Sequence, residues 1–449
     1  MKKPNIIHLS WHDLGRFLGC YGREPLRSPN VDRLAAEGVR LTNYWATSSI
    51  CSPSRTSALT GRYCQTVGVA GLCHAPANYH LDAGVPHLSH ILRDAGFSTA
   101  LIGWQHETTH ERVHNDLGFK EIYLNDPCPE CEEVSGRAVE WLEEQARRQK
   151  DGDDQPFYLQ LGFIEIHRSR GDYGQKPEDD EQLWIPPWLS DSPALRQELA
   201  LQQANIRKAD ASVGVVLDAI DRLGLRENTL LVFTSDHGMG CVPRAKTSLY
   251  DGGIEIPLIV RWPDGGIGGG NSCDWYLSNV DFLPTLLDLV NVEKPEVLHG
   301  ESFAGAFRKP ESDGGREEIF ANFVQSQRMI RTRTHKLIWN AQPKRVLVGH
   351  PVMETMEMQP GWPIWEFYDI HRDPHETTNI TTQVPIDHAG AHQEAVNLQW
   401  EKVEHQPETE AELRRRLLQK LREIGDPIVD TIPLCDYDIR ARESLKEAE

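Results

Sequence analysis

A short stretch of the chain places a cysteine, a proline and an arginine where a helix is expected to begin. The residues from Cys51 to Arg55 read Cys-Ser-Pro-Ser-Arg, and a Leu-Thr-Gly sequence ends at Gly61. Proline is tolerated in the first turn of a helix and glycine commonly ends one, so the spacing predicts a short helix over 51–61. Cys51 would then lie at the helix N-terminus, where free N–H groups favour an anion, with Arg55 one turn further along the same side. We therefore expect a reactive centre that binds an anionic group.

Other residues suited to acid–base or metal chemistry follow apolar runs that read as strands. These runs cover residues 6–9, 99–102, 157–163 and 229–233. Short apolar runs bounded by polar turns predict a sheet that is covered on both faces. Helical patterns lie between them, over residues 28–38, 131–150 and 194–223. The first of these patterns has Ser28 as its expected cap. Alternation of strands and helices predicts an α/β sandwich.

The polar residues after these strands are expected to meet. In open α/β sheets, ligands bind outside the carboxyl ends of the strands. The side chains at those ends are His12 and Asp13, Trp104 and His106, His167 and Arg168, and Asp236 and His237. This convergence predicts a single site at one edge of the sheet.

The Cys51-to-Arg55 motif resembles that of the sulfatases of the alkaline-phosphatase superfamily, and the resemblance extends over nearly the whole chain. In that family the cysteine is oxidised to formylglycine, and the hydrated aldehyde is the nucleophile. The resemblance implies an alkaline-phosphatase-like fold, with a large mixed sheet flanked by helices and a smaller C-terminal α+β subdomain. The motif, together with Arg-Asp-Pro-His-Glu at 372–376, is most similar to the sulfamidase (N-sulfoglucosamine hydrolase) branch and to bacterial carbohydrate sulfatases.

The resemblance also implies a divalent metal beside Cys51, with Asp13, Asp236 and His237 as ligands. Sulfatases usually carry two adjacent aspartates after the first strand, whereas this chain has His12 before Asp13. Calcium or magnesium is the family's metal. Two imidazoles suit manganese or zinc better than calcium, which prefers oxygen, so the identity of the metal stays open.

The same resemblance assigns roles to four further residues. It implies that Arg55 and His106 hold and deprotonate the aldehyde hydrate. It implies that Lys246 and His167 bind the sulfate and protonate the leaving group. These roles fit the chemistry, because an alcohol leaving group needs an acid and the developing charge on the sulfuryl oxygens needs cationic donors.

Trp104 departs from the family pattern, because it stands where sulfatases carry the lysine of Gly-Lys-x-His. The change removes a cation that is expected to touch both the sulfate and the nucleophile. Either Arg168 or Arg244 is a candidate substitute. Alternatively, the indole stacks on a sugar or aryl ring of the substrate.

The pattern of the chain changes after residue 310, so we expect a catalytic domain over 1–310 and a C-terminal subdomain over 311–449. Two short antiparallel strands are predicted at 327–331 and 336–339. Residues 366–379 resemble the C-terminal signature of sulfatases, which implies a strand followed by a turn. A terminal helix over 409–424 is predicted with a capping box at Thr409 and Glu412. We expect this subdomain to close one side of the site.

The composition of the chain limits the classes of molecule that it is expected to bind. The 449 residues carry a net charge of −20, which repels polyanions, argues against nucleic acid and favours small sulfated substrates. No secretory signal and no membrane-spanning stretch are visible, so we expect a cytoplasmic protein without a membrane partner. Nine irregularly spaced cysteines argue against a disulfide framework. The Cys-x-x-Cys at 128–131 has no second half, so we interpret it as a loop feature in preference to a metal or redox pair. A formylglycine-generating maturation enzyme is an implied partner, and a homo-oligomer is left open.

Two alternatives to a sulfatase remain. Phosphonate and phosphate monoester hydrolases of the same superfamily share the nucleophile motif and an Asp-His metal pair. A degenerate sulfatase would bind sulfated ligands without turnover, as the changes at His12 and Trp104 could indicate. The degenerate form is disfavoured because five residues of the family's site are all present, namely Cys51, Arg55, His106, His167 and Lys246.

Overall fold

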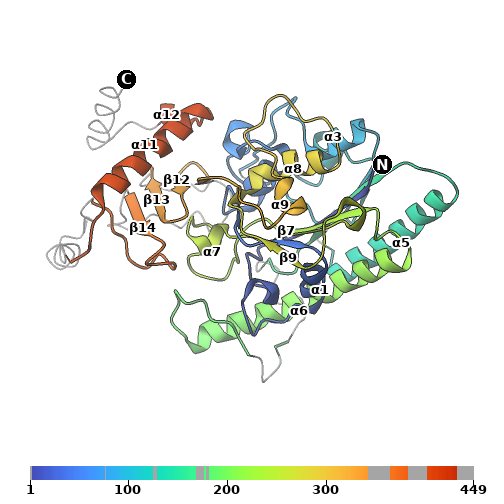
Figure 1. The fold of residues 1–449 in the computed structure, drawn as a ribbon, viewed down its shortest axis with the longest axis horizontal. Coiled ribbons are helices and arrows are strands. Elements are labelled where there is room, and N and C mark those ends of the chain that lie inside the picture. The colour runs from blue at the N-terminus through green and yellow to red at the C-terminus, as the bar shows by residue number, and fades with distance from the viewer. Residues whose placement is uncertain are drawn as a thin grey trace.

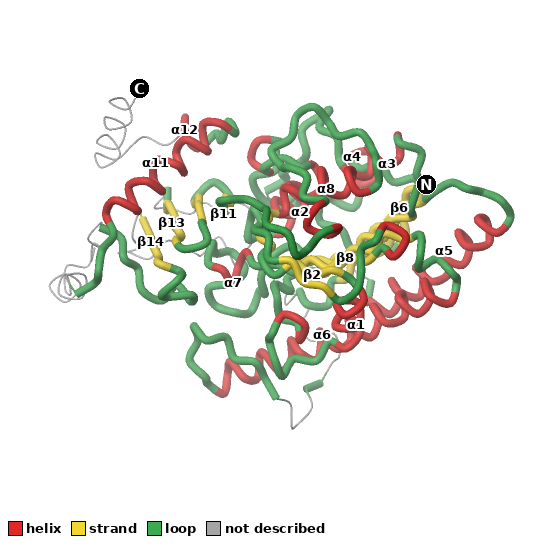
Figure 2. Tube along the Cα trace, viewed as in Figure 1, coloured by secondary structure: helices red, strands yellow, loops and turns green. Residues whose placement is uncertain are grey.

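The computed structural model describes residues 3–75, 77–124, 129–167, 176–177, 182–341, 365–382 and 402–431. An eight-stranded mixed sheet occupies the centre of the molecule (Figures 1 and 2). In spatial order its strands are β5 (Glu121–Tyr123), β4 (Ser98–Gly103), β6 (Phe157–Phe163), β1 (Asn5–Trp11), β7 (Thr229–Ser235), β8 (Leu258–Arg261), β2 (Val39–Leu41) and β9 (Asn271–Cys273). The strands from β5 to β7 are parallel, and β8 runs antiparallel to both β7 and β2.

Helices cover both faces of this sheet (Figure 1). One face packs against α1 (Pro29–Glu37), α5 (Cys131–Lys150) and α6 (Pro193–Arg222). The other packs against α2 (Cys51–Thr60), α3 (Leu88–Asp94) and α8 (Phe282–Leu289). Successive strand residues alternate between the two cores, as Ile6 and Ile7 of β1 do. The predicted α/β class with helices on both faces is confirmed.

The C-terminal part forms a second, antiparallel sheet. Its order is β11 (Ile319–Phe323), β12 (Gln327–Arg331), β13 (His335–Asn340) and β14 (Trp365–Asp369). Helix α11 (Pro407–Glu423) packs its leucines on this sheet, and α12 (Ile428–Thr431) follows. The predicted pair of antiparallel strands is confirmed as β12 and β13. The division into residues 1–310 and 311–449 stays a prediction.

The remaining elements are short. They are the strand pair β3 (Tyr44–Trp45) and β10 (Leu277–Ser278), the helices α4 (Val113–Asp116), α7 (Asp251–Ile254) and α9 (Gly305–Arg308), and the 3₁₀ turns η1 (Gly19–Tyr21), η2 (Cys64–Thr66), η4 (Pro263–Gly265) and η5 (Asn279–Asp281). No helix in the described part of the chain combines the length and the apolar composition needed to cross a bilayer.

One predicted helix cap is wrong, and the other has the predicted position without the capping bond. Helix α11 begins at Pro407, so Thr409 lies inside the first turn rather than at the cap. The fixed φ of proline suits the first helical position and starts the helix earlier than the Thr–Glu spacing implied. Ser28 does occupy the cap position of α1, but its hydroxyl donates to Asp32 and makes no capping bond.

The register of the central strands decides where the site lies. Trp11 at the end of β1 pairs with Phe163 at the end of β6 and with Ser235 at the end of β7. The three strands therefore end at one level, and the polar residues that follow them leave the sheet side by side.

Candidate active site

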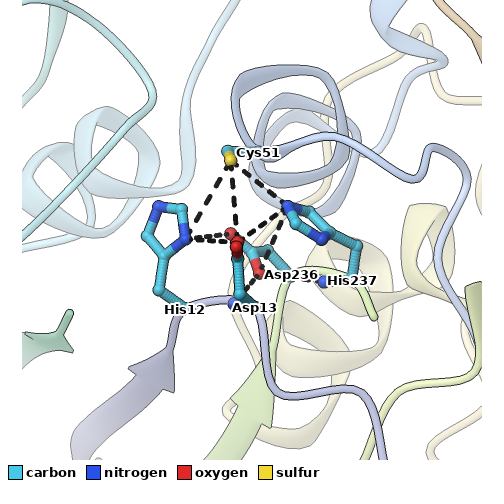
Figure 3. Close-up of side chains that lie close together, drawn as sticks. All are labelled: His12, Asp13, Cys51, Asp236 and His237. Carbon is cyan, nitrogen blue, oxygen red and sulfur yellow. Dashed lines mark hydrogen bonds and ion pairs between the residues drawn. The ribbon is translucent and has the colours of Figure 1, made fainter. Parts of the chain in front are cut away.

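Five buried side chains meet above the ends of β1 and β7 (Figure 3). They are His12, Asp13, Cys51, Asp236 and His237, and one ligand atom from each lies within 4.8 Å of all the others. This is the donor group predicted from the sequence. We call it the donor cluster.

Cys51 is the first residue of α2, as predicted. Gly61 ends the helix in a left-handed conformation with φ 67°, which glycine adopts without strain. The Cys51 sulfur lies 3.2 Å from His237 Nε2 and 3.9 Å from His12 Nδ1. Burial raises the pKa of the Cys51 thiol well above its usual value, so burial outweighs the helix N-terminus and the unmodified side chain is a neutral thiol.

Arg55 anchors α2 to the end of β1. Its Nε donates to Asp236 Oδ2 at 3.0 Å, and its two terminal nitrogens donate to Ser10 Oγ and the Trp11 carbonyl, each at 3.2 Å. Glu107 lies 3.8 Å from the same guanidinium. Arg55 thus links α2 to one carboxylate of the donor cluster.

The two aspartates of the cluster are ionised. Burial alone would raise the pKa of Asp13, but the nearby positive charge of Lys246 holds it well below its usual range. Lys246 donates to both Asp13 oxygens, at 3.0 and 2.7 Å. The Asp13 backbone N–H donates to Asp236 Oδ1 at 3.0 Å, which draws the two loops together. Asp13 holds this position with φ 53°, an uncommon backbone conformation for a residue other than glycine.

The histidines direct nitrogen atoms at these carboxylates. His237 Nδ1 lies 2.9 Å from the Gly238 carbonyl, which can only accept, so Nδ1 carries the proton and Nε2 presents its lone pair to the cluster. His12 Nδ1 lies 2.8 Å from Asp13 Oδ1 and 3.5 Å from Asp236 Oδ2. Two carboxylates and two imidazole nitrogens, buried together, form a donor set that fits a divalent metal ion.

Lys246 and His167 adjoin the cluster on the Asp13 side. Lys246 Nζ lies 3.2 Å from His167 Nε2, and that imidazole nitrogen lies 4.0 Å from Asp13 Oδ2. Burial lowers the pKa of His167 to about 3, so its ring is neutral and Nε2 accepts a hydrogen bond from the ammonium. Burial alone would lower the pKa of Lys246. The negative charge of Asp13 outweighs this effect, so the net shift raises the pKa and the amine stays protonated.

His106 lies against His12, with ring centroids 5.5 Å apart, and stacks on His74 at 5.2 Å. Burial lowers the pKa of His106 well below its usual value, which leaves a neutral imidazole beside the cluster. The structure therefore brings together the predicted nucleophile, metal-ligand and proton-transfer residues, which are Cys51, Arg55, His106, His167, Lys246, His12, Asp13, Asp236 and His237.

Trp104 joins this group of rings, with its centroid 5.4 Å from that of His106 and 6.1 Å from that of His12. Arg168, one candidate for the missing cation, lies outside the described residues. Arg244, the other, does not take that role, because its guanidinium lies over the Tyr250 ring at 3.9 Å and donates to the Glu376 carbonyl.

Sequence reasoning missed Ser10 and Glu107, which both contact Arg55. Ser10 lies inside β1, where a small polar residue carries no signal of its own. Glu107 directly follows His106 in a polar turn, and that position could have identified it. Of the Cys-x-x-Cys pair, Cys128 lies outside the described residues, so its interpretation as a loop feature stays a prediction. Cys131 is a buried cysteine without a disulfide.

Comparisons with known proteins agree with this geometry. A family model described as Sulfatase matches residues 4–292, and one described as N-sulphoglucosamine sulphohydrolase, C-terminal, matches residues 244–396. An ulvan-active sulfatase of Formosa agariphila is 26% identical over 430 residues, covering 84% of this chain and 71% of that protein. Human N-sulphoglucosamine sulphohydrolase is 27% identical over 451 residues, covering 84% of this chain and 86% of that protein.

Solved structures show the same fold. A 2-O GAG sulfatase superposes with a TM-score of 0.67 at 18% identity, covering 96% of this chain and 95% of that one. A phosphonate monoester hydrolase of Agrobacterium radiobacter superposes with a TM-score of 0.63 at 18% identity, covering 97% and 99%. Likeness at this level of identity concerns the fold alone, so it does not choose between these two chemistries.

Proposed function

The chain belongs to the sulfatase family, whose model spans residues 4–292, and from that premise we propose that it removes sulfate from a small sulfated saccharide. It is a hydrolase of sulfuric esters. The observation that carries the proposal is the Cys51 sulfur at the start of α2, 3.2 Å from His237 and beside the paired carboxylates of Asp13 and Asp236. A nucleophile, cations and a metal-binding donor set are the parts that transfer of an anionic sulfuryl group requires.

The saccharide class is supported by the relatives. One is an ulvan-active sulfatase and another an N-sulphoglucosamine sulphohydrolase, and the family model of the latter's C-terminal part covers residues 244–396 here. We therefore propose a carbohydrate O-sulfate or N-sulfate as the substrate. Parallel assays on glucosamine 6-O-sulfate and glucosamine N-sulfate distinguish the two bonds.

Cys51 is proposed to be converted to formylglycine, which supplies a hydrated aldehyde as the nucleophile. His106 is neutral and beside the cluster, which suits it to accept a proton from that hydrate. Arg55 fixes Asp236 and adds positive charge next to α2. Lys246 holds its proton 3.2 Å from His167 Nε2, so the pair can bind a sulfuryl oxygen and pass a proton to the leaving group.

A divalent metal is proposed to bind Asp13, Asp236 and His237, with His12 as a further ligand. Such an ion supplies positive charge that brings the sulfuryl oxygens and the nucleophile together. The family's expectation is calcium or magnesium, whereas the two imidazoles favour manganese or zinc. We propose the latter pair for this chain.

The first test is the mass of the tryptic peptide 41–55, from protein made in its native cells or together with a maturation enzyme. Conversion of the thiol to an aldehyde lowers the mass by about 18 Da. We expect the shift in wild type, and we expect Cys51→Ala to fold normally and lose turnover of an aryl sulfate. Activity that survives in Cys51→Ala would contradict the nucleophile assignment, and faster turnover of an aryl phosphonate than of the sulfate would favour the alternative hydrolase.

Location and partners are proposals of the same kind. We propose a cytoplasmic enzyme that meets a formylglycine-generating enzyme during maturation and acts without nucleic acid or membrane. Cell fractionation tests the compartment, and light scattering of the purified protein tests for a homo-oligomer.

A further inference from the structure

Residues 244–251, which we call the Lys246 segment, connect the active site to the C-terminal sheet. The segment is not regular, since Arg244 and Thr247 adopt φ values of 62° and 69°. The β-branched Thr247 is rarely found in that conformation, so surrounding contacts must hold it there. One such contact is its N–H, which donates to the Ser49 carbonyl just before α2 at 2.9 Å.

A single residue of the turn after β14 holds both ends of this segment. At the start, the Arg244 guanidinium donates to the backbone carbonyl of Glu376. At the end, the Asp251 backbone N–H donates to the Glu376 carboxylate at 2.7 Å. Glu376 is 2% exposed, so both contacts are shielded from water. Lys246 lies between these two points.

Two cations from the C-terminal sheet complete the attachment. Arg331 of β12 donates to both Asp251 oxygens, at 3.0 and 2.8 Å. Lys336 of β13 contacts the carboxylates of Asp251 and Glu376 and donates to the Leu249 carbonyl at 3.1 Å. Because these cations are paired with buried carboxylates, removing a carboxylate would leave a buried cation with fewer partners.

We propose that Glu376 is a positioning residue that holds Lys246 against Asp13 and His167. This inference rests on the proposed role of Lys246 in sulfate binding. It gives the Arg-Asp-Pro-His-Glu turn a physical role: its last residue fixes the segment that carries an active-site cation. The C-terminal sheet thus takes part in catalysis by setting where the Lys246 ammonium lies.

The variant Glu376→Ala removes the carboxylate that accepts the hydrogen bond from the Asp251 backbone N–H. The variant Glu376→Gln keeps an amide oxygen that can accept the same hydrogen bond. Asp426→Asn is the matched control, because Asp426 is also 2% exposed and pairs with Arg328 of β12 at 2.6 Å. Within the described part of the chain its carboxylate bonds to Gln65, Arg328 and the Ile428 N–H, and not to the Lys246 segment. All three changes are expected to lower thermal stability. Only the Glu376 variants are expected to free the segment, and Glu376→Gln less than Glu376→Ala.

Amide hydrogen exchange tests the attachment without any substrate. In Glu376→Ala we expect peptides covering 244–251 to exchange about tenfold faster than in wild type, whereas Asp426→Asn leaves them unchanged. Equal exchange in Glu376→Ala and wild type would overturn the proposal. Because no turnover is needed, this result is independent of whether the sulfatase function itself holds.

A double-mutant cycle tests the route through Lys246. We expect Glu376→Ala to lower kcat/KM for 4-nitrophenyl sulfate roughly 10- to 100-fold, counted per formylglycine-containing protein. In a Lys246→Ala background the same change should cost less than about twofold, because the group it positions is already gone. An equal loss in both backgrounds, or an equal loss in Asp426→Asn, would show a merely structural role and overturn the proposal.

Discussion

At the scale of single residues, His12 distinguishes this site from an all-carboxylate metal centre. Its Nδ1 lies within 3.5 Å of oxygens from both Asp13 and Asp236, so an imidazole stands where a third carboxylate would otherwise add negative charge. A softer nitrogen ligand lowers the preference for calcium and raises that for manganese or zinc.

We therefore expect His12→Asp to change the metal preference. After chelation, wild type should regain more activity with Mn²⁺ or Zn²⁺ than with Ca²⁺, and His12→Asp should favour Ca²⁺ or Mg²⁺ by about tenfold. Thermal shifts on adding each ion give the same ranking without substrate. His74→Ala, which alters only the ring stacked on His106, is the control. An unchanged ranking of ions in His12→Asp would exclude His12 as a ligand.

At the scale of secondary-structure elements, β1 carries a histidine that serves no active-site role. The ring nitrogens of His8 are buried and have no hydrogen-bond partner among the described residues, and the ring lies 5.0 Å from that of Phe282. Burial, and secondarily the charge of Arg55, lowers the pKa of His8 from 6.5 to about 3. The central strand therefore accommodates His8 only as the neutral form.

Because burial keeps His8 neutral, the free energy of unfolding is expected to fall as the pH falls. Well above pH 6.5, His8 is neutral in both the folded and the unfolded state, and its contribution to the free energy of unfolding is constant. Between pH 6.5 and about 3 the unfolded chain binds a proton that the folded protein does not, so the free energy of unfolding falls as pH falls, by up to about 1.4 kcal/mol per pH unit.

Denaturant melts at several pH values test this with His8→Leu, which packs in the same core without a titratable group. We expect the variant to lose less stability than wild type between pH 6.5 and 4, and to differ little above pH 7. His114 is exposed, so the variant His114→Leu serves as the control. Its free energy of unfolding should depend on pH as that of wild type does. Parallel curves for His8→Leu and wild type would show that His8 is not the group that titrates.

The elements could be predicted from sequence where one local signal dominated. Strand β6 and helix α5 have the predicted bounds, because a continuous apolar run and an amphipathic pattern ended in clear turns. The strands β8, β2 and β9, of which β8 runs antiparallel to its neighbours, were not located from the sequence, since they are too short to show a period. The contact between Lys246 and Asp13 joins residues far apart in the chain, and resemblance rather than spacing placed them in one site.

Local conformation was also beyond sequence reasoning. Nothing in the residue types indicates that Asp13 and Thr247 adopt positive φ, because tertiary contacts impose it. The role of Glu376 was hidden for the same reason: its partners Arg244 and Asp251 belong to a different part of the chain. The resemblance marked the turn, but only the fold shows what the turn holds.

At the scale of the whole molecule, the net charge of −20 acts on every anionic substrate before it reaches the site. The cations of the site do not offset this charge at long range, since Lys246 and Arg55 are paired with Asp13 and Asp236. A long sulfated polysaccharide carries many negative charges close to the protein surface and is repelled more strongly than a saccharide with one sulfate.

Ionic strength should therefore separate the two kinds of substrate. Raising salt from about 0.01 to 0.15 M shortens the screening length from about 30 to 8 Å, which removes most of the repulsion. We expect kcat/KM for a long sulfated polysaccharide to rise several-fold over this range, and that for a monosulfated saccharide to change less than about twofold. Neutral osmolyte at matched concentration controls for effects on the enzyme itself. A fall in activity on the polysaccharide with added salt would instead indicate a basic path to the site and would contradict the preference for small substrates.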